Sequence, residues 1–183
     1  ALAAERVVPM LFRAAPRASS HSRLEWLLAF ATVSINTIIS VAGWFLWKLG
    51  CLQLNQQASV LVILRDTLVL VLAMDLALYV LHRGAHMKWF YSWAHYLHHE
   101  YREVRMLTLF VMHPLEALGF GSLWVLTLTL YDFSVEAVVI FLQLNLYFGL
   151  AAHCGFYPYP NWLNRVLSAF HIALPEFHLQ HHR

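Results

Sequence analysis

The sequence predicts an all-α integral membrane protein, a helical bundle with about four transmembrane helices. The 183 residues are 60% hydrophobic and 15% aromatic but only 12% charged, whereas a typical soluble domain carries about 25% charged residues. Several apolar stretches are long enough to cross a bilayer as helices, and the charged residues gather mainly between them. A disordered chain and an ordinary soluble domain are excluded, because so few charges cannot cover a water-facing surface.

The N-terminal segment, residues 1–23, is basic and contains four arginines against a single acid, Glu5. Such a segment is typical of an organellar presequence remnant, and equally of a basic flank that precedes a membrane span. The remaining residues, 24–183, are expected to form one membrane domain, because the chain is long enough for one domain and too short for two.

Four apolar stretches are predicted to be membrane-spanning helices. The first is uncharged and ends at Lys48, whereas the second contains Arg65, Asp66 and Asp75, so a bent or partly interfacial helix is the alternative there. Only a few residues separate the third from the fourth, as in an antiparallel helical hairpin. In order, the stretches run from Trp26 to Trp47, from about Val60 to Leu81, from about Leu115 to Tyr131 and from about Val135 to Ala152.

The basic residues lie almost entirely on one side of this predicted bundle. If each stretch crosses the membrane once, residues 1–23, 82–106 and 153–183 share one side. That side holds ten Lys and Arg residues, whereas the other side holds Lys48. The positive-inside rule makes the first side cytoplasmic or its organellar equivalent.

Histidine is the unusual component, because 12 histidines exceed the ten acidic residues. Residues three and four positions apart lie on one face of a helix, so a short histidine motif aims its imidazoles in one direction. Imidazole binds iron, zinc, copper and nickel, and the predicted topology brings three such motifs to the cytoplasmic-type face as a histidine-box metal site. Polar cover of an interfacial surface and a proton-sensing cluster are the alternatives, but neither needs repeated spacing. The motifs are H-x3-H at His82 and His86, H-x2-H-H at His95, His98 and His99, and H-x2-H-H at His178, His181 and His182.

The order of these motifs resembles the fatty acid hydroxylase/sterol desaturase superfamily of membrane di-iron oxygenases. Residues 75–83 are similar to that family's approach to its first motif. Residues 113–116 (His-Pro-Leu-Glu) resemble its His-Pro element, and residues 153–156 (His-Cys-Gly-Phe) resemble its His-Ser-Gly-Tyr element. The resemblance covers about Asp75 to His182. Acyl-CoA desaturases have similar motifs but separate the first two more widely, so they fit less well.

The resemblance implies a site of nine histidines that holds two iron ions. Zinc is the alternative occupant, because it binds nitrogen ligands more tightly than ferrous iron does. The implied activity is O2-dependent hydroxylation or desaturation of a C–H bond in a membrane lipid, either a fatty acyl chain or a sterol. No side chain beyond the ligands is expected to act in catalysis. The implied ligands are His82, His86, His95, His98, His99, His153, His178, His181 and His182.

Three further residues are candidates for contacts that support the ligands. Asp75 lies seven residues before His82 on the same helical face, and a carboxylate inside a span costs ~2.5–3.5 kcal/mol. We therefore expect Asp75 either to hydrogen-bond a ligand imidazole or to pair with a neighbour such as Arg65. His113 precedes a proline, where a role in starting a helix is the alternative. His171 either supports the third motif or lies at the surface.

The expected partners are a membrane lipid, O2 and a separate electron donor such as cytochrome b5, because the chain has no His-Pro-Gly-Gly signature of a fused donor. Nucleic acid is not expected, because no RNP, zinc-finger or basic-helix motif is present. The resemblance implies the endoplasmic reticulum, with the mitochondrial inner membrane or a plastid membrane as alternatives. The alternative function is a non-catalytic hydroxylase-like subunit of a larger membrane complex. The basic start, and a sequence that ends one residue after His182, favour that alternative.

Overall fold

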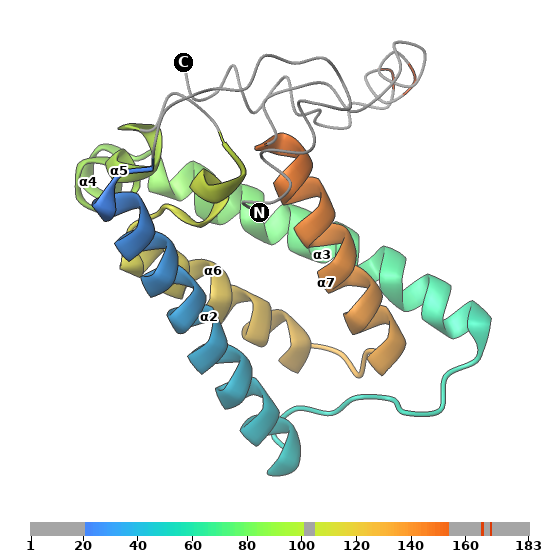
Figure 1. The fold of residues 1–183 in the computed structure, drawn as a ribbon. Helices are drawn as coiled ribbons and strands as arrows, with labels where there is room; N and C mark the ends of the chain where they lie inside the picture. The colour runs from blue at the N-terminus through green and yellow to red at the C-terminus, as the bar shows by residue number, and fades with distance from the viewer. Residues whose placement is uncertain (1–20, 101–104, 154–165, 167–168, 170–183) are drawn as a thin grey trace.

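The computed structural model describes residues 21–100 and 105–153, together with Val166 and Ala169. Within these ranges it contains helices and no strand; an isolated bridge joins Asn55 to Ser134. The all-α prediction is therefore confirmed over the described residues (Figure 1). The long helices are α2 (Arg23–Lys48), α3 (Val60–Ala85), α6 (Pro114–Thr129) and α7 (Val135–Ala152).

The ends of the long helices follow from local signals in the sequence. Ser22 and Glu25 form a capping box at the start of α2: the Ser22 hydroxyl accepts the Glu25 N–H at 3.1 Å and the Glu25 carboxylate accepts the Ser22 N–H at 2.5 Å. Beyond α2 the chain turns through Gly50, whose φ of 75° suits glycine. Pro114 begins α6, a position where its missing N–H costs nothing. The four predicted stretches consequently match the four long helices to within a few residues.

Short helical segments fill the interval between α3 and α6. They are α4 (Lys88–Phe90), the π-helical turn η1 (Tyr91–His95), α5 (Tyr96–Glu100) and the 3-10 helix η2 (Met106–Phe110). All of them lie at one end of the bundle, where α2 and α6 begin and where α3 and α7 end (Figure 1). We refer to this end as the histidine end.

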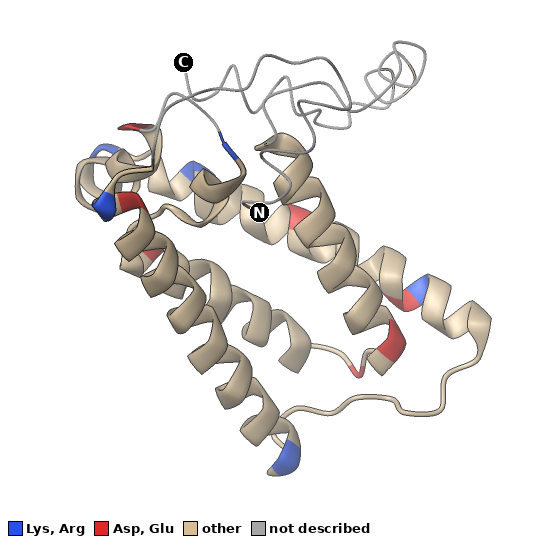
Figure 2. Cartoon of the chain, viewed as in Figure 1, with Lys and Arg blue, Asp and Glu red and all other residues tan. Residues whose placement is uncertain are grey.

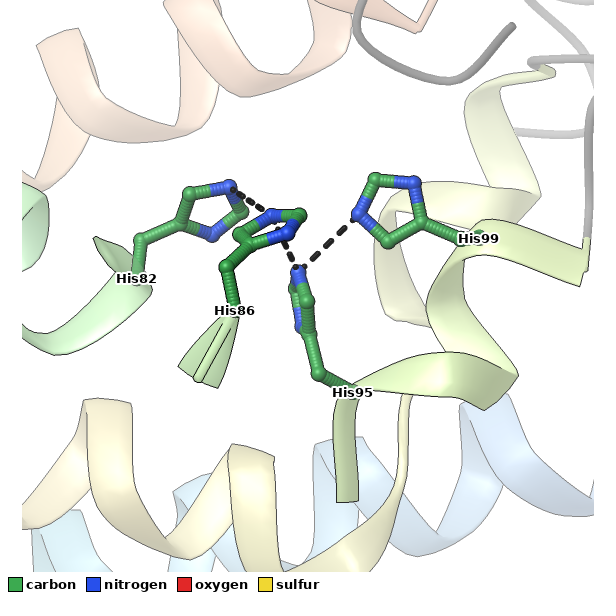
Figure 3. A group of neighbouring side chains, drawn as sticks. All are labelled: His82, His86, His95 and His99. Carbon is green, nitrogen blue, oxygen red and sulfur yellow. Dashed lines mark hydrogen bonds between the residues drawn. The ribbon is translucent and has the colours of Figure 1, made fainter. Parts of the chain in front are cut away.

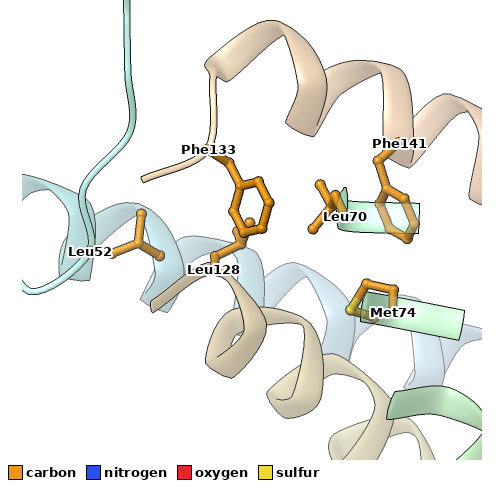
Figure 4. Close-up of a cluster of buried hydrophobic side chains, with 6 residues drawn as sticks. All are labelled: Leu52, Leu70, Met74, Leu128, Phe133 and Phe141. Atoms are coloured by element: carbon orange, nitrogen blue, oxygen red, sulfur yellow. The ribbon is translucent and has the colours of Figure 1, made fainter. Parts of the chain in front are cut away.

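The long helices pack in two pairs, α2 against α6 and α3 against α7, with α3 also touching α6. Gly121 of α6 faces α2 so closely that an added Cβ would lie 2.4 Å from the Ile39 Cδ1 atom. A cluster of buried apolar side chains joins α3, α6 and α7 to the loops at the end of the bundle opposite the histidine end (Figure 4). A smaller cluster joins α2 to η2 at the histidine end. The first cluster consists of Leu52, Leu70, Met74, Leu128, Phe133 and Phe141.

Two of the long helices, α2 and α7, are long and apolar enough to cross a membrane. The other two long helices are less typical of membrane spans. Helix α3 carries three charged residues, Arg65, Asp66 and Asp75. Helix α6 has 16 residues and spans about 24 Å, less than a hydrocarbon core of ~30 Å. Many large apolar side chains on the long helices are exposed, including Phe30 at 74%. Such a surface fits a lipid environment, and the number of four spans stays a prediction.

A polar latch fastens α3 to the turn between α6 and α7, at the end opposite the histidine end. The Asp66 side chain is fully buried and accepts the Ser134 N–H at 2.8 Å and the Arg65 guanidinium at 2.9 Å. Arg65 also donates to the Tyr131 hydroxyl at 2.6 Å. Arg65 thus pairs with Asp66 rather than with Asp75.

Replacing Asp66 with alanine is expected to weaken this latch. The buried Ser134 N–H then has no acceptor, which costs about 1–3 kcal/mol of unfolding free energy. The measurement is the apparent Tm of the detergent-solubilised chain. The Asp132→Ala variant is the control, because Asp132 is exposed in the same turn. Equal loss of thermal stability in both variants would contradict the latch.

Candidate metal centre

The end of α3 and the helical segments that follow it bring the first two histidine motifs together (Figure 3). His82 lies in the last turn of α3, and His86 is the residue that caps its end. His95 ends the π-helical turn η1, and His99 lies one turn further along in α5. The ligand nitrogens of these four side chains all lie within 4.8 Å of one another. We call them the four-histidine group.

The spacing of the four-histidine group fits a metal ion. Four nitrogens bound tetrahedrally at 2.0–2.1 Å from zinc would lie about 3.4 Å apart. The Nε2 atoms of His82 and His86 are 3.3 Å apart, and those of His86 and His95 are 3.2 Å apart. The Nε2 atoms of His95 and His99 are 3.0 Å apart. A nitrogen donor set without thiolates suits iron, zinc, copper or nickel.

The four-histidine group is enclosed on one side and open on the other. The His95 side chain is fully buried, His82 and His99 are half-buried, and His86 is exposed. The His95 ring contacts all three of the others, with centroid distances of 4.6–4.7 Å. His95 is therefore the central member, and access from outside is from the His86 side.

A buried carboxylate lies behind His95. Glu116 belongs to the first turn of α6, and its Oε1 atom is 2.7 Å from the Nδ1 atom of His95. Glu116 belongs to the His-Pro-Leu-Glu motif of residues 113–116, but the motif indicated no role for this carboxylate. Glu116 follows Pro114 in the first turn of a helix, where a carboxylate is favoured, and this was the available signal. No spacing in the sequence predicts that Glu116 contacts His95, which lies 21 residues away.

His98 and His153 lie beside the four-histidine group rather than within it. The His98 ring stacks on His95 with centroids 5.6 Å apart, and its centroid is 6.2 Å from that of His153. Both side chains are buried. His153 caps the end of α7, and its Nδ1 atom lies 3.1 Å from the hydroxyl of Thr108 in η2. His98 therefore lies between the four-histidine group and His153, with its ring stacked on His95.

The other residues predicted to bind or support a metal are not part of the four-histidine group. His113 is the N-cap of α6, where its Nδ1 atom accepts the Leu115 N–H at 3.3 Å. Asp75 is exposed on α3, and no hydrogen bond or ion pair joins it to another side chain in the described part of the chain. The assignment of nine ligands stays a prediction. Four predicted residues lie outside the described residues: His171, His178, His181 and His182.

Comparison with known proteins gives the context of this site. The fatty acid hydroxylase family model matches residues 67–183, more than half of the chain. Methylsterol monooxygenase 2-2 of Arabidopsis thaliana is 33% identical over 109 residues, which are 60% of this chain and 40% of the relative. Very-long-chain aldehyde decarbonylase GL1-8 of Oryza sativa subsp. indica matches with the same identity and coverage.

No solved structure matches this chain. The chain spans less than half of the length of the curated relatives that it matches. The family match nevertheless begins within α3 and includes every residue of the four-histidine group. The chain therefore belongs to the fatty acid hydroxylase family, in the fatty acid hydroxylase/sterol desaturase superfamily.

Proposed function

We propose that this protein is a membrane di-iron oxygenase that hydroxylates or desaturates a C–H bond of a lipid, a fatty acyl chain or a sterol. The observation that carries the proposal is the convergence of four imidazoles at metal-ligand spacing. Membership of the fatty acid hydroxylase family supports it. The relatives' names include a methylsterol and a very-long-chain aldehyde, which are both apolar molecules.

The histidines would have different roles at such a site. His82, His86, His95 and His99 would hold one ion, and His98 and His153 would contribute to a second. When bound, iron supplies the chemistry that activates O2. Neutral imidazoles leave most of the metal charge uncompensated, which favours an electrophilic oxidant. The buried His95, His98 and His153 keep water from the deep side, whereas the exposed His86 leaves a side for O2 and substrate.

We also propose that all four long helices cross the membrane, with the histidine end on the cytoplasmic-type face. Four described basic residues support this orientation: Arg23, Arg83, Lys88 and Arg105 all belong to segments at that end (Figure 2). The opposite end has Lys48 and, in its latch, Arg65. A separate electron donor such as cytochrome b5 would dock at the histidine end, where an acidic donor surface would complement the basic side chains. The endoplasmic reticulum is the proposed membrane.

Exposed aromatic side chains test where the membrane surface lies. Trp89 is 86% exposed and Trp93 is 66% exposed, and tryptophan is enriched at membrane interfaces. In vesicles of brominated lipid, wild-type tryptophan fluorescence is expected to be quenched more strongly than that of the Trp89→Phe/Trp93→Phe variant. The control is Trp124→Phe, because Trp124 stacks on Phe141 inside the bundle. Unchanged quenching in the double variant, with strong quenching by aqueous iodide in the wild type, would contradict this placement.

The function itself is tested by metal analysis of protein extracted gently from its native membrane. Two irons per chain, with oxidised lipid products that depend on O2 and an electron donor, are the expected result. Zinc alone, without oxidised lipid, would contradict the oxygenase. A metal-free chain that always copurifies with other subunits would favour the non-catalytic alternative.

A further inference from the structure

We propose that Glu116 and Thr108 are positioning residues, each of which holds one histidine in the tautomer whose Nε2 atom is the metal ligand. Glu116 acts on His95, and Thr108 acts on His153. The inference rests on the proposed metal site and deepens it. It concerns residues that would not themselves touch a metal.

The geometry at His95 fixes its tautomer. An ionised carboxylate can only accept hydrogen bonds, so the 2.7 Å contact requires the proton of His95 on Nδ1. The Nε2 atom then carries the lone pair, and it is the atom that faces the Nε2 atoms of His86 and His99. Glu116 lies in the first turn of α6, where the N–H groups and the positive end of the helix dipole favour a carboxylate.

The geometry at His153 leads to the same tautomer through a neutral group. The Thr108 hydroxyl has one proton, and it donates that proton to the Arg105 carbonyl at 2.7 Å. The same oxygen accepts the Arg105 N–H at 3.0 Å. The third contact, at 3.1 Å to His153, must therefore be donated by the ring from Nδ1. The His153 Nε2 atom is left with its lone pair.

Both positioning residues are themselves held in place. Thr108 lies in η2, which begins after Arg105, and the Arg105 guanidinium pairs with the buried Glu25 of α2. Glu116 lies in the first turn of α6, behind the Pro114 start. The two histidines are therefore oriented from different helices, His95 by a carboxylate of α6 and His153 by a neutral hydroxyl of η2. Only His95 is backed by a negative charge, so we expect its contribution to metal binding to be the more sensitive of the two.

The test compares zinc affinity and histidine tautomers in the full chain, reconstituted in lipid nanodiscs. Zinc affinity is measured by competition with a chelator, and tautomers are measured by nitrogen NMR of 15N-histidine-labelled protein without metal. Glu116→Leu and Thr108→Val are each expected to lower zinc affinity about 10–100-fold, as happens when a residue that hydrogen-bonds a metal-binding histidine is removed, with the larger loss for Glu116→Leu. Each variant should lose the Nδ1–H signal of one histidine. Thr108→Ser should retain both affinity and signal.

Thr127→Val is the matched control, because the buried Thr127 hydroxyl donates within α6, to the Leu123 carbonyl at 2.9 Å, and has no other hydrogen bond among the described residues. Wild-type affinity and tautomers in Glu116→Leu and Thr108→Val would overturn the inference while leaving the metal site intact. A wild-type chain that binds no zinc would instead overturn the proposed function. If the variants fail to fold, the wild-type nitrogen NMR spectrum alone tests the inference. A proton on Nε2 of His95 and of His153 in that spectrum would refute it.

Discussion

Replacing His95 with alanine is expected to abolish metal binding by the four-histidine group and to reduce oxygenase activity to background. His95 is the central member, 3.2 Å from His86 and 3.0 Å from His99 between Nε2 atoms. Its removal also leaves the buried Glu116 carboxylate without its partner. An unsatisfied buried acceptor costs about 1–3 kcal/mol, and more when it is charged. Metal content per chain and the apparent Tm measure the two effects.

His86→Ala is the matched comparison for this prediction. His86 is exposed, whereas His95 is buried against Glu116, so the loss of His86 should lower metal content with a smaller change in Tm. The double variant His95→Ala/Glu116→Ala should regain part of the lost Tm without regaining metal. Equal thermal stability of His95→Ala and His86→Ala would contradict the role given to the Glu116 contact.

Replacing Arg105 with methionine is expected to destabilise the histidine end as a whole. Arg105 pairs with Glu25, and both side chains are largely buried, with exposed fractions of 14% and 3%. Removing one partner of a buried ion pair costs about 3–5 kcal/mol, and here Glu25 keeps the Ser22 N–H but loses its guanidinium partner. The change also removes the ion pair that fastens the start of η2 to α2, so Thr108 holds His153 less firmly. The measurements are the apparent Tm and zinc affinity.

Two further variants separate the charge from the packing. The Glu25→Leu/Arg105→Met double variant should recover much of the Tm, because no buried charge then lacks a partner. Arg83→Met is the control, since Arg83 is exposed and hydrogen-bonds only Tyr79 among the described contacts. A loss in Arg83→Met as large as that in Arg105→Met would argue against the buried pair.

The helices could be predicted because their signals are local. Uncharged or nearly uncharged stretches, with Ser22 at one start and Pro114 at another, determine where helices begin and end. The histidine spacing likewise predicted that His82 would lie near His86, one turn away. Such contacts depend only on helix geometry, so no knowledge of packing was needed.

The arrangement of the site depends on contacts that no spacing encodes. Helix spacing places His95, His98 and His99 on one stripe, but it does not indicate that His98 would also lie near His153, 55 residues further along the chain. Glu116 lies 21 residues from His95, and Glu25 lies 80 residues from Arg105. These pairs follow from how α2, α3 and α6 pack together. The sequence identified the types of residue at the site, and packing determined which of them meet.

The π-helical turn η1 determines how α5 is rotated about the helix axis relative to α3. A π-helical turn contains one more residue than a regular turn, and each residue of a helix rotates the chain by about 100°. A regular helical turn over Tyr91–His95 would leave every histidine in the sequence. It would nevertheless swing α5, and with it His99, about a quarter of a turn away from α3. Loss of metal after such a change in the turn would reflect the altered orientation of α5, although no ligand had been removed.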